Sequence, residues 1–260
     1  MHKPYLFSLL ILIKSACAFA QYNSIECIEV LGNETSDIIP VSNKVEAYVY
    51  RSAIDLSGLD VQKKKQDFIN LMLPSILISK FELEQTRLKV QILINKSDDL
   101  SDEDHLYLNE LKKSYKCKTT SELLSRLQTH PTSIVIAQAA LESGWGTSRF
   151  YCEANNIFGI WSYSKSEPRI KASEVREGKS VYVRKYDSLP ESIASYFKTI
   201  ARGPYSEFRI KRKKTNDVYE LITHLKVYSE LRDEYVRRLE QVIKYNHLVQ
   251  YDSYTLKMKN

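Results

Sequence analysis

The strongest apolar pattern of the chain predicts one long helix in its first half. Apolar side chains recur near helical spacing from Val61 to about Asn95. Pro74 falls inside this run, where a proline can start or kink a helix. The preceding residues 21–60 mix polar and β-branched side chains, and within them only Glu46 to Arg51 is typical of a strand. We therefore expect a weakly patterned leader followed by a dominant helix.

A second group of helices follows, and the most apolar of them begins near Pro131. Ser101, followed by acidic residues, is typical of a helix N-terminus, and a short helix is expected from Glu122 to Leu127. The residues after Pro131 are mostly apolar or small, so other helices can approach them closely. We expect this helix to be the buried centre of a domain. Gly144 and Gly146 can supply the left-handed backbone at its C-terminus.

Shorter patterns predict a small β-lobe ahead of a further set of helices. Ile157 to Ser162 and Ser180 to Tyr186 are each typical of strands, and the charged stretch Ser164 to Lys179 is expected to be a polar loop. Helices are then expected at Glu191 to Ala201, Val218 to Lys226 and Arg232 to Val249. This order predicts an α+β fold that is mainly α, with a larger helical lobe and a small β-lobe.

The N-terminus has the order of a secretory signal peptide. A positive charge at Lys3 precedes an apolar run at residues 5–13, and Ala18-Phe19-Ala20 is a small-x-small cleavage site. An uncleaved N-terminal anchor is the alternative. No second apolar stretch is long enough to cross a bilayer, so no membrane span is expected after removal of residues 1–20. The sequence therefore predicts an exported protein, periplasmic or extracellular.

Charge and cysteine content limit the classes of partner. The formal net charge is +6, which is too weak by itself to indicate nucleic acid, and we expect no nucleic-acid partner. The basic run Arg209 to Lys214 is interpreted as a solvated loop, or alternatively as a contact for an anionic polymer or membrane surface. No CxxC spacing occurs and the histidines are scattered, so no metal site is expected. Pairing among Cys27, Cys117 and Cys152 is left open.

Glu142 is the residue that the apolar pattern marks as a candidate for catalysis. It ends an otherwise apolar helix, where burial and the negative end of the helix dipole both oppose its ionisation. A carboxyl group that stays protonated near neutral pH is suited to general acid catalysis, as in glycosidases. Trp145 lies three residues further on, and a flat aromatic ring can pack against a sugar. The alternative is that Glu142 faces solvent or pairs with Arg149.

Two separated motifs carry a resemblance to a known family. Residues 137–148 read AQAALESGWGTS and residues 155–160 read NNIFGI. Together they resemble the signature of the glucosaminidase domain of glycoside hydrolase family 73, and most closely its Bax-type bacterial members. Further matches occur downstream, and the resemblance covers roughly residues 130–247. It implies a lysozyme-like fold in which the two lobes flank a groove for an extended glycan.

The resemblance also implies an activity and a catalytic acid. It implies cleavage of the β-1,4 bond after N-acetylglucosamine in peptidoglycan, without cofactor, by a protein that is expected to be a monomer with glycan strands as its partner. Glu142 aligns with the acid of the family. Two rival interpretations are a lytic transglycosylase on the same fold and a non-catalytic glycan-binding protein. The expected domains are residues 1–20 as signal peptide, 21–128 as N-terminal helical extension, 129–250 as glucosaminidase domain and 251–260 as tail.

The second catalytic group is left open between three candidates. Family members often carry another carboxylate some way beyond the first, and Glu174 and Glu177 lie in that window. Either could activate a water once the loop that carries them closes over bound glycan, or both could be solvated charges on a surface loop without a catalytic part. Tyr228 matches a tyrosine near the family's active site, with helix packing as its alternative role. The third candidate is the acetamido oxygen of the substrate itself.

Several other residues are expected to contact or support the glycan, by resemblance. Gly159 would let glycan approach the backbone closely. Asn156 either binds an N-acetyl group or caps the turn into the strand, and Phe158 is more typical of a core position than of a contact. Trp161 is considered for sugar stacking, and Tyr235 matches the second tyrosine of the late motif. The expected substrate-binding residues are Trp145, Asn156, Phe158, Gly159, Trp161 and Tyr235.

Overall fold

The computed structural model describes residues 25–96, 99–176 and 179–258. The expected signal peptide, residues 1–20, lies outside them. The helices are α1 (Val61–Lys96), α2 (Asp102–Tyr115), α3 (Thr120–Arg126), α4 (Thr132–Ser143), α5 (Arg149–Ala154), α6 (Leu189–Arg202), α7 (Ser206–Lys211), α8 (Val218–Ile222) and α9 (Asp233–Tyr245). Short 3₁₀ helices are η1 (Thr35–Asp37), η2 (Thr223–Tyr228) and η3 (Leu248–Ser253).

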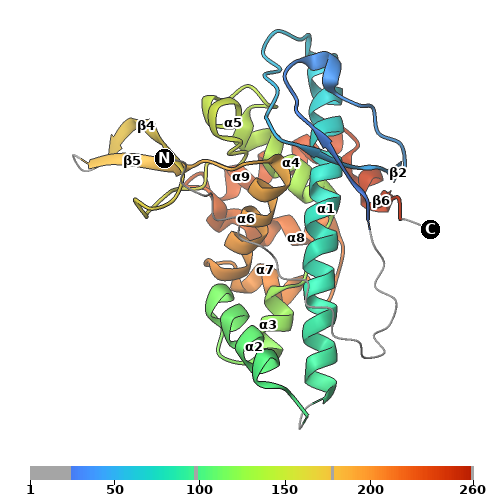
Figure 1. Cartoon of the computed structure of the whole chain (residues 1–260). Coiled ribbons are helices and arrows are strands. Elements are labelled where there is room, and N and C mark those ends of the chain that lie inside the picture. Colours follow the sequence, from blue (N-terminus) through green and yellow to red (C-terminus); the bar gives the residue numbers. More distant parts are fainter. Residues whose placement is uncertain (1–24, 97–98, 177–178, 259–260) are drawn as a thin grey trace, which may run out of the picture.

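The strands form three separate pairs. β1 (Cys27–Val30) lies parallel to β3 (Ala47–Tyr50), and β2 (Lys44–Val45) lies parallel to β6 (Thr255–Leu256). β4 (Arg169–Arg176) and β5 (Lys179–Arg184) form an antiparallel hairpin that projects from the helical body (Figure 1). The prediction of a mainly helical α+β fold with a small β-lobe is therefore confirmed, and the expected strand near residues 46–51 is present as β3.

Helix α1 is the long helix that the apolar pattern predicts, and it runs the length of the molecule (Figure 1). Pro74 neither starts nor ends it, because the buried face on both sides of the proline packs against α4 and α6. Ser75 Oγ donates to the Leu71 carbonyl within the same turn, at 3.2 Å. At its start, α1 places Phe68 against the turn that follows α4.

Helix α4 is the buried centre, as its small apolar side chains predict. At its N-terminus the Asp252 carboxylate accepts hydrogen bonds from Ser133 N and Ser133 Oγ, each at 2.8 Å. A carboxylate there compensates the positive end of the helix dipole. At the C-terminus Gly144, Trp145 and Gly146 all have positive φ, at 59°, 58° and 78°. This left-handed turn ends the helix directly after Glu142 and Ser143.

One large core joins the two halves of the chain. Its buried apolar residues come from residues 38–78 and again from residues 134–256. A second, smaller cluster involves the C-terminal half of α1 together with α2 and α3. The expected domain boundary at residues 128/129 falls between α3 and α4, and the large core extends across it. The division into domains stays a prediction.

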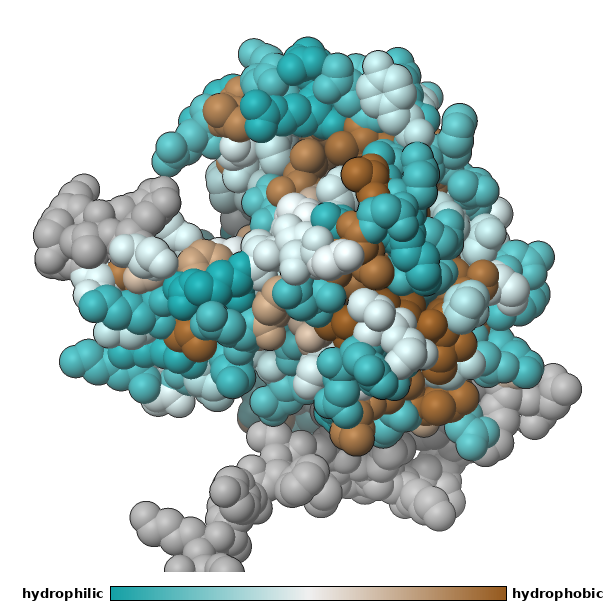
Figure 2. Space-filling view, turned by 90° about the horizontal axis from the view of Figure 1, so that it is seen from above, coloured by the Kyte–Doolittle hydropathy of each residue, from teal (hydrophilic) through white to brown (hydrophobic). Residues whose placement is uncertain are grey.

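Two predictions for the β-lobe are wrong. Residues 157–162 form a turn instead of a strand, and only Trp161 makes a bridge, to Val183. Asn155 and Gly159 have φ of 52° and 62°, which interrupts any extended backbone there. Within the stretch 164–179, residues 169–176 form strand β4 and not a loop, because their backbone pairs with β5. Its many charged residues fit a projecting hairpin, whose surface is mainly hydrophilic in Figure 2.

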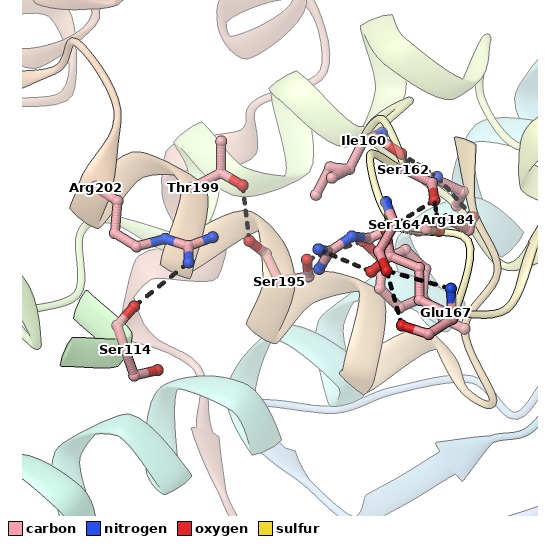
Figure 3. Close-up of polar contacts among 12 residues, drawn as sticks. Ser114, Ile160, Ser162, Ser164, Glu167, Arg184, Ser195, Thr199 and Arg202 are labelled. Carbon is pink, nitrogen blue, oxygen red and sulfur yellow. Dashed lines mark hydrogen bonds and ion pairs between the residues drawn. The ribbon is translucent and has the colours of Figure 1, made fainter. Parts of the chain in front are cut away.

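The hairpin is fastened to the body at its base. Glu167, just before β4, accepts a hydrogen bond from Ser162 Oγ at 2.7 Å and forms an ion pair with Arg184 on β5, at 2.9 Å (Figure 3). Arg184 N also donates to the Ile160 carbonyl, at 3.0 Å. These contacts connect the segment before β4, the strand β5 and the turn at residues 157–160 into one unit.

The interpretation of the basic run at residues 209–214 as a solvated loop is also wrong. Arg209 and Lys211 belong to α7, and Arg212 is only 3% exposed. The Arg212 guanidinium donates to the Ser125 carbonyl at 2.9 Å, and Arg209 donates to the carbonyls of Ile200 and Gly203. Two of the arginines therefore stabilise backbone carbonyls inside the fold. Over the described ranges, no helix has the length and apolarity needed to cross a membrane.

Candidate active site

Glu142 lies in the last turn of α4 and is partly exposed. The Tyr235 hydroxyl on α9 donates to Glu142 Oε1 at 2.9 Å. Burial raises the pKa of Glu142 to about 7, although the hydrogen bond from Tyr235 acts in the opposite direction. The alternative of a Glu142–Arg149 pair is wrong, because Arg149 pairs with Glu153. A large fraction of Glu142 therefore stays protonated up to about neutral pH, where an ordinary glutamate is fully ionised.

Aromatic rings surround this carboxyl group. Tyr228 stacks on Tyr235 with ring centroids 5.5 Å apart and an angle of 11° between the planes, and Tyr205 lies 6.0 Å from Tyr228. Burial is the main cause that raises the pKa of each of these tyrosines, and the negative charge of Glu142 adds to it. They consequently stay protonated as hydroxyl donors. Among the described residues, the Tyr228 hydroxyl has no hydrogen-bond partner.

A set of polar residues behind Glu142 was missed by the sequence reasoning. Gln138 is buried on α4 and donates to the Tyr235 hydroxyl, and Tyr196 and His130 continue the contacts away from Glu142. One signal was available, since Gln138 and Glu142 stand four residues apart and so share a helix face. Tyr196 and His130 carry no such signal, because they come from distant parts of the chain.

Trp145 lies beside the site but faces another surface. Its ring meets Phe68 edge-on, with centroids 5.6 Å apart, and Lys65 Nζ lies 5.2 Å from the ring centroid. It lines an open pocket of about 280 Å³ whose other lining residues include Lys65, Leu141 and Arg238, but not Glu142. Stacking of Trp145 on a sugar stays a prediction.

The turn at residues 155–160 supports the site from the side of the β-lobe. The Asn156 amide donates to the Ile160 and Arg184 carbonyls and accepts from Ile160 N, so it caps the turn. Phe158 is a core residue that stacks on Tyr196, with ring centroids 4.2 Å apart. Gly159 has open space where a Cβ would be, which is compatible with close approach of a ligand. Trp161, which belongs to the β-lobe, is half-buried. Its ring centroid lies 6.2 Å from that of Tyr163.

The two candidate carboxylates of the β-lobe lie at or beyond the end of strand β4. Glu174 belongs to strand β4, near the end that pairs Arg176 with Lys179, but its side chain is not among those described. Glu177 lies outside the described residues. Within the described part of the chain, no cluster of three or more His, Cys, Asp or Glu side chains is suitable for a metal ion. Cys27, Cys117 and Cys152 are free thiols.

The comparison with known proteins assigns the family. A family model described as glucosaminidase, mannosyl-glycoprotein endo-β-N-acetylglucosaminidase, matches residues 117–248, which is half of the chain. Exo-glucosaminidase LytG of Bacillus subtilis is 28% identical over 209 residues, which cover 76% of this chain and 71% of that protein. Protein bax of Escherichia coli is 28% identical over 213 residues, which cover 74% and 73%.

Among solved structures, the catalytic domain of the autolysin Auto from Listeria monocytogenes is similar in part. It is 24% identical, with a TM-score of 0.41, over 62% of this chain and 96% of that domain. The sequence motifs, the helix that ends in a protonated carboxyl group and the family match agree with one another. The chain therefore belongs to the glucosaminidase family, glycoside hydrolase family 73, and it is a glycosidase.

Proposed function

We propose that the protein hydrolyses the glycan strands of peptidoglycan at the β-1,4 bond after N-acetylglucosamine, with Glu142 as the general acid. The observation that carries this proposal is the partly exposed Glu142 carboxyl group, whose pKa of about 7 leaves a large protonated fraction up to neutral pH. The family of the chain and the name of the relative LytG, an exo-glucosaminidase, support the glycan as the substrate class.

In this reaction Glu142 transfers its proton to the oxygen of the leaving sugar as the glycosidic bond breaks. The bond electrons go to that oxygen, and positive charge develops at the anomeric carbon. A water then adds to this carbon and loses one proton. Glu142 is suited to the first step because its proton is held by desolvation and released to a basic leaving group.

Tyr228 is proposed to contact the sugar on the reacting side. Its hydroxyl has no partner among the described residues, although its ring is held by stacking on Tyr235. Burial keeps the pKa of Tyr228 well above its ordinary value, so the hydroxyl is a donor at any working pH. A donor in this position supports binding of the acetamido oxygen or a ring hydroxyl of the substrate.

The group that assists the water remains one of three candidates. Glu174 or Glu177 would act as a base if the hairpin brings a carboxylate near the cleavage point. Alternatively, the acetamido oxygen of the substrate attacks the anomeric carbon, with Tyr228 orienting it. Variants Glu174→Gln, Glu177→Gln and the double variant separate these routes. Loss of turnover in one of them identifies the base, and full activity in all three favours the substrate-assisted route.

Digestion of purified peptidoglycan, followed by reduction and mass analysis of the products, tests the function. Hydrolysis adds one water per cut and leaves a reducible N-acetylglucosamine end, whereas a lytic transglycosylase leaves an anhydro sugar. Glu142→Gln is the matched control, because it is nearly isosteric and lacks the transferable proton. We expect its turnover to fall roughly 10²–10⁴-fold. Glycan binding without products from the wild-type protein would instead indicate a binding protein.

A peptidoglycan substrate requires that the protein leave the cytoplasm. We propose export followed by action in the periplasm or outside the cell, by a monomer. The basis is the signal-peptide pattern of residues 1–20 and the exo-glucosaminidase name of a relative. Detection of the mature N-terminus near Gln21 in an exported fraction would support it, and retention of the full chain in the cytoplasm would contradict it.

A further inference from the structure

A continuous series of hydrogen bonds leads from the interior of the fold to Glu142. His130 Nε2 lies 2.9 Å from the Tyr196 hydroxyl, which donates to Gln138 Oε1 at 2.6 Å. Gln138 Nε2 donates to the Tyr235 hydroxyl at 3.1 Å, and Tyr235 donates to Glu142 Oε1 at 2.9 Å. The first four residues are buried, so water does not compete for these contacts.

Each residue in this series has few protons to donate. This fixes which partner is the donor in each hydrogen bond. A tyrosine hydroxyl has one proton, so Tyr235, which donates to Glu142, must accept from Gln138. Tyr196, which donates to Gln138, must likewise accept from His130 Nε2–H. All four bonds then point the same way, from His130 toward the Glu142 carboxyl group.

The reverse order of donors and acceptors is disfavoured, and the reason lies at His130. Reversal would require Tyr196 to donate to His130 Nε2 and would move the imidazole proton to Nδ1. Nδ1 is buried and has no acceptor among the described residues. Burial, with smaller contributions from Arg212 and Lys80, holds the pKa of His130 well below its ordinary value, so the ring is neutral and has a single N–H. A lone pair, and not a proton, is therefore favoured on Nδ1.

Rigid packing keeps the series in place. Phe158 stacks on Tyr196, and the His130 ring meets Phe208 edge-on with centroids 5.1 Å apart. Among the described residues, the titratable groups that interact with Glu142 are four tyrosines from α6, the start of α7, η2 and α9, and the hydroxyl of Tyr235 is the one bonded to it. The direction of that single bond consequently decides how the Glu142 proton is placed.

We propose that His130, Tyr196 and Gln138 are positioning residues that hold Tyr235 as a donor to Glu142 Oε1, and thereby keep the transferable proton on Oε2. Oε2 makes no hydrogen bond within the described part of the chain, so it is the carboxyl oxygen left to face the glycosidic oxygen. This inference rests on the proposed role of Glu142 as the acid. Without the series, Tyr235 can turn its proton toward Gln138, and the Glu142 proton can then be trapped between Oε1 and Tyr235.

The test is the pH dependence of kcat in variants of the full-length protein. Tyr196→Phe and His130→Leu break the series. Because Glu142 loses part of its bond from Tyr235, we expect the alkaline midpoint of kcat to move upward by about 0.5 to 1 in pH. We expect kcat to fall on the order of tenfold with KM unchanged, because the broken contacts do not reach the substrate.

Two further variants separate a positioning role from a merely structural one. His130→Gln retains an N–H near the place of Nε2 and should keep the wild-type pH profile. Tyr50→Phe removes another buried hydroxyl, which accepts a hydrogen bond from Ile39 N away from the series, and it should also leave the profile unchanged. Infrared titration of the Glu142 carboxyl group, assigned by comparison with Glu142→Gln, reports the same pKa without depending on activity.

Unchanged alkaline midpoints in both Tyr196→Phe and His130→Leu would overturn the proposal, as would a His130→Gln profile equal to that of His130→Leu. If Tyr196→Phe fails to fold, the two His130 variants still decide the matter. Full activity of Glu142→Gln would contradict the proposed acid itself. Inactive Glu142→Gln combined with unmoved midpoints would contradict only the positioning series.

Discussion

At the scale of single residues, the surroundings of Glu142 disfavour its ionised form and thereby suit it to donate a proton. The carboxyl group follows a buried apolar helix, and it accepts a hydrogen bond from the buried Tyr235, so it is largely desolvated. Desolvation is the largest cause of its raised pKa, and the hydrogen bond from Tyr235 only partly offsets it. The same desolvation that destabilises the carboxylate makes the protonated form available for catalysis.

The rate of glycan cleavage should therefore fall as pH rises through about 7. Glu142 must be protonated to act as the acid, so kcat should follow the protonated fraction and decrease about tenfold for each pH value above that point. The tyrosines near Glu142 have pKa values raised above 10 and do not interfere between pH 6 and 9. A profile measured on soluble glycan fragments checks this, and a rate that stays flat to pH 9 would contradict it.

The same raised pKa of Glu142 should also make the stability of the fold decrease as pH rises. Glu142 has a folded-state pKa of about 7 against an ordinary value of 4.5, so its favourable contribution is complete below pH 4.5 and is lost as pH rises through 7. The loss amounts to at most about 3 kcal/mol, since the side chain is partly exposed. Glu142→Gln stays neutral, and we expect its gain in melting temperature over wild type to be larger at pH 8 than at pH 5. Equal gains at both pH values would argue against a buried ionisable group.

At the scale of elements, the turn after α4 fixes the position of Glu142 in the last turn of that helix. Gly144, Trp145 and Gly146 have left-handed backbones, and Ser143 Oγ accepts a hydrogen bond from Gly146 N at 3.0 Å. At Gly146 a Cβ would lie 3.0 Å from Leu56 and 3.2 Å from Phe68. The turn is therefore held both by its own backbone and by the close approach of α1 and the segment before it.

Gly146→Ala and Gly159→Ala form a matched pair for this turn. Both glycines have positive φ, but a Cβ at Gly159 meets open space. We expect Gly159→Ala to lower the free energy of unfolding by about 1–2 kcal/mol, from backbone strain alone. Gly146→Ala adds overpacking against Leu56 and Phe68, and we expect a loss of about 2–4 kcal/mol. Urea unfolding measures both, and equal losses would show that the packing around Gly146 is loose.

At the scale of the whole molecule, the N-terminal helix is part of the structure that carries the site. The fully buried side chains of α1 include Phe68, Leu71, Met72 and Ile76, and they pack in the same core as α4, α6 and α9. Phe68 contacts both Trp145 and Tyr151. Removing α1 would expose a large apolar surface directly beneath the turn that positions Glu142.

A fragment of residues 129–260 should consequently fail to fold cooperatively, whereas residues 21–260 should fold. Each large apolar side chain lost from a core costs about 2–5 kcal/mol, and a domain has only about 5–15 kcal/mol of net stability. Thermal unfolding followed by circular dichroism, together with amide hydrogen exchange, distinguishes the two fragments. Cooperative melting of residues 129–260 would show that the glucosaminidase half has a sufficient core of its own.

The sequence alone was enough to determine the features that depend on neighbouring residues. The spacing of apolar side chains predicted α1 and α4 close to their observed bounds, and Ser101 with Asp104 forms the expected N-terminal cap of α2. The lone carboxyl group after an apolar helix predicted the raised pKa of Glu142. Such features follow from periodicity and local backbone chemistry, which act over a few residues.

Only the tertiary structure decided what lies around that carboxyl group. Tyr235 reaches Glu142 across 93 residues, and Tyr196 reaches Gln138 across 58. Strand β4 exists because β5 pairs with it, although its charged sequence is typical of a loop, and Arg212 is buried because distant carbonyls accept its protons. These contacts depend on how packed helices and strands meet in space, and no spacing along the chain encodes them. The direction in which protons point toward Glu142 is a property of the assembled core.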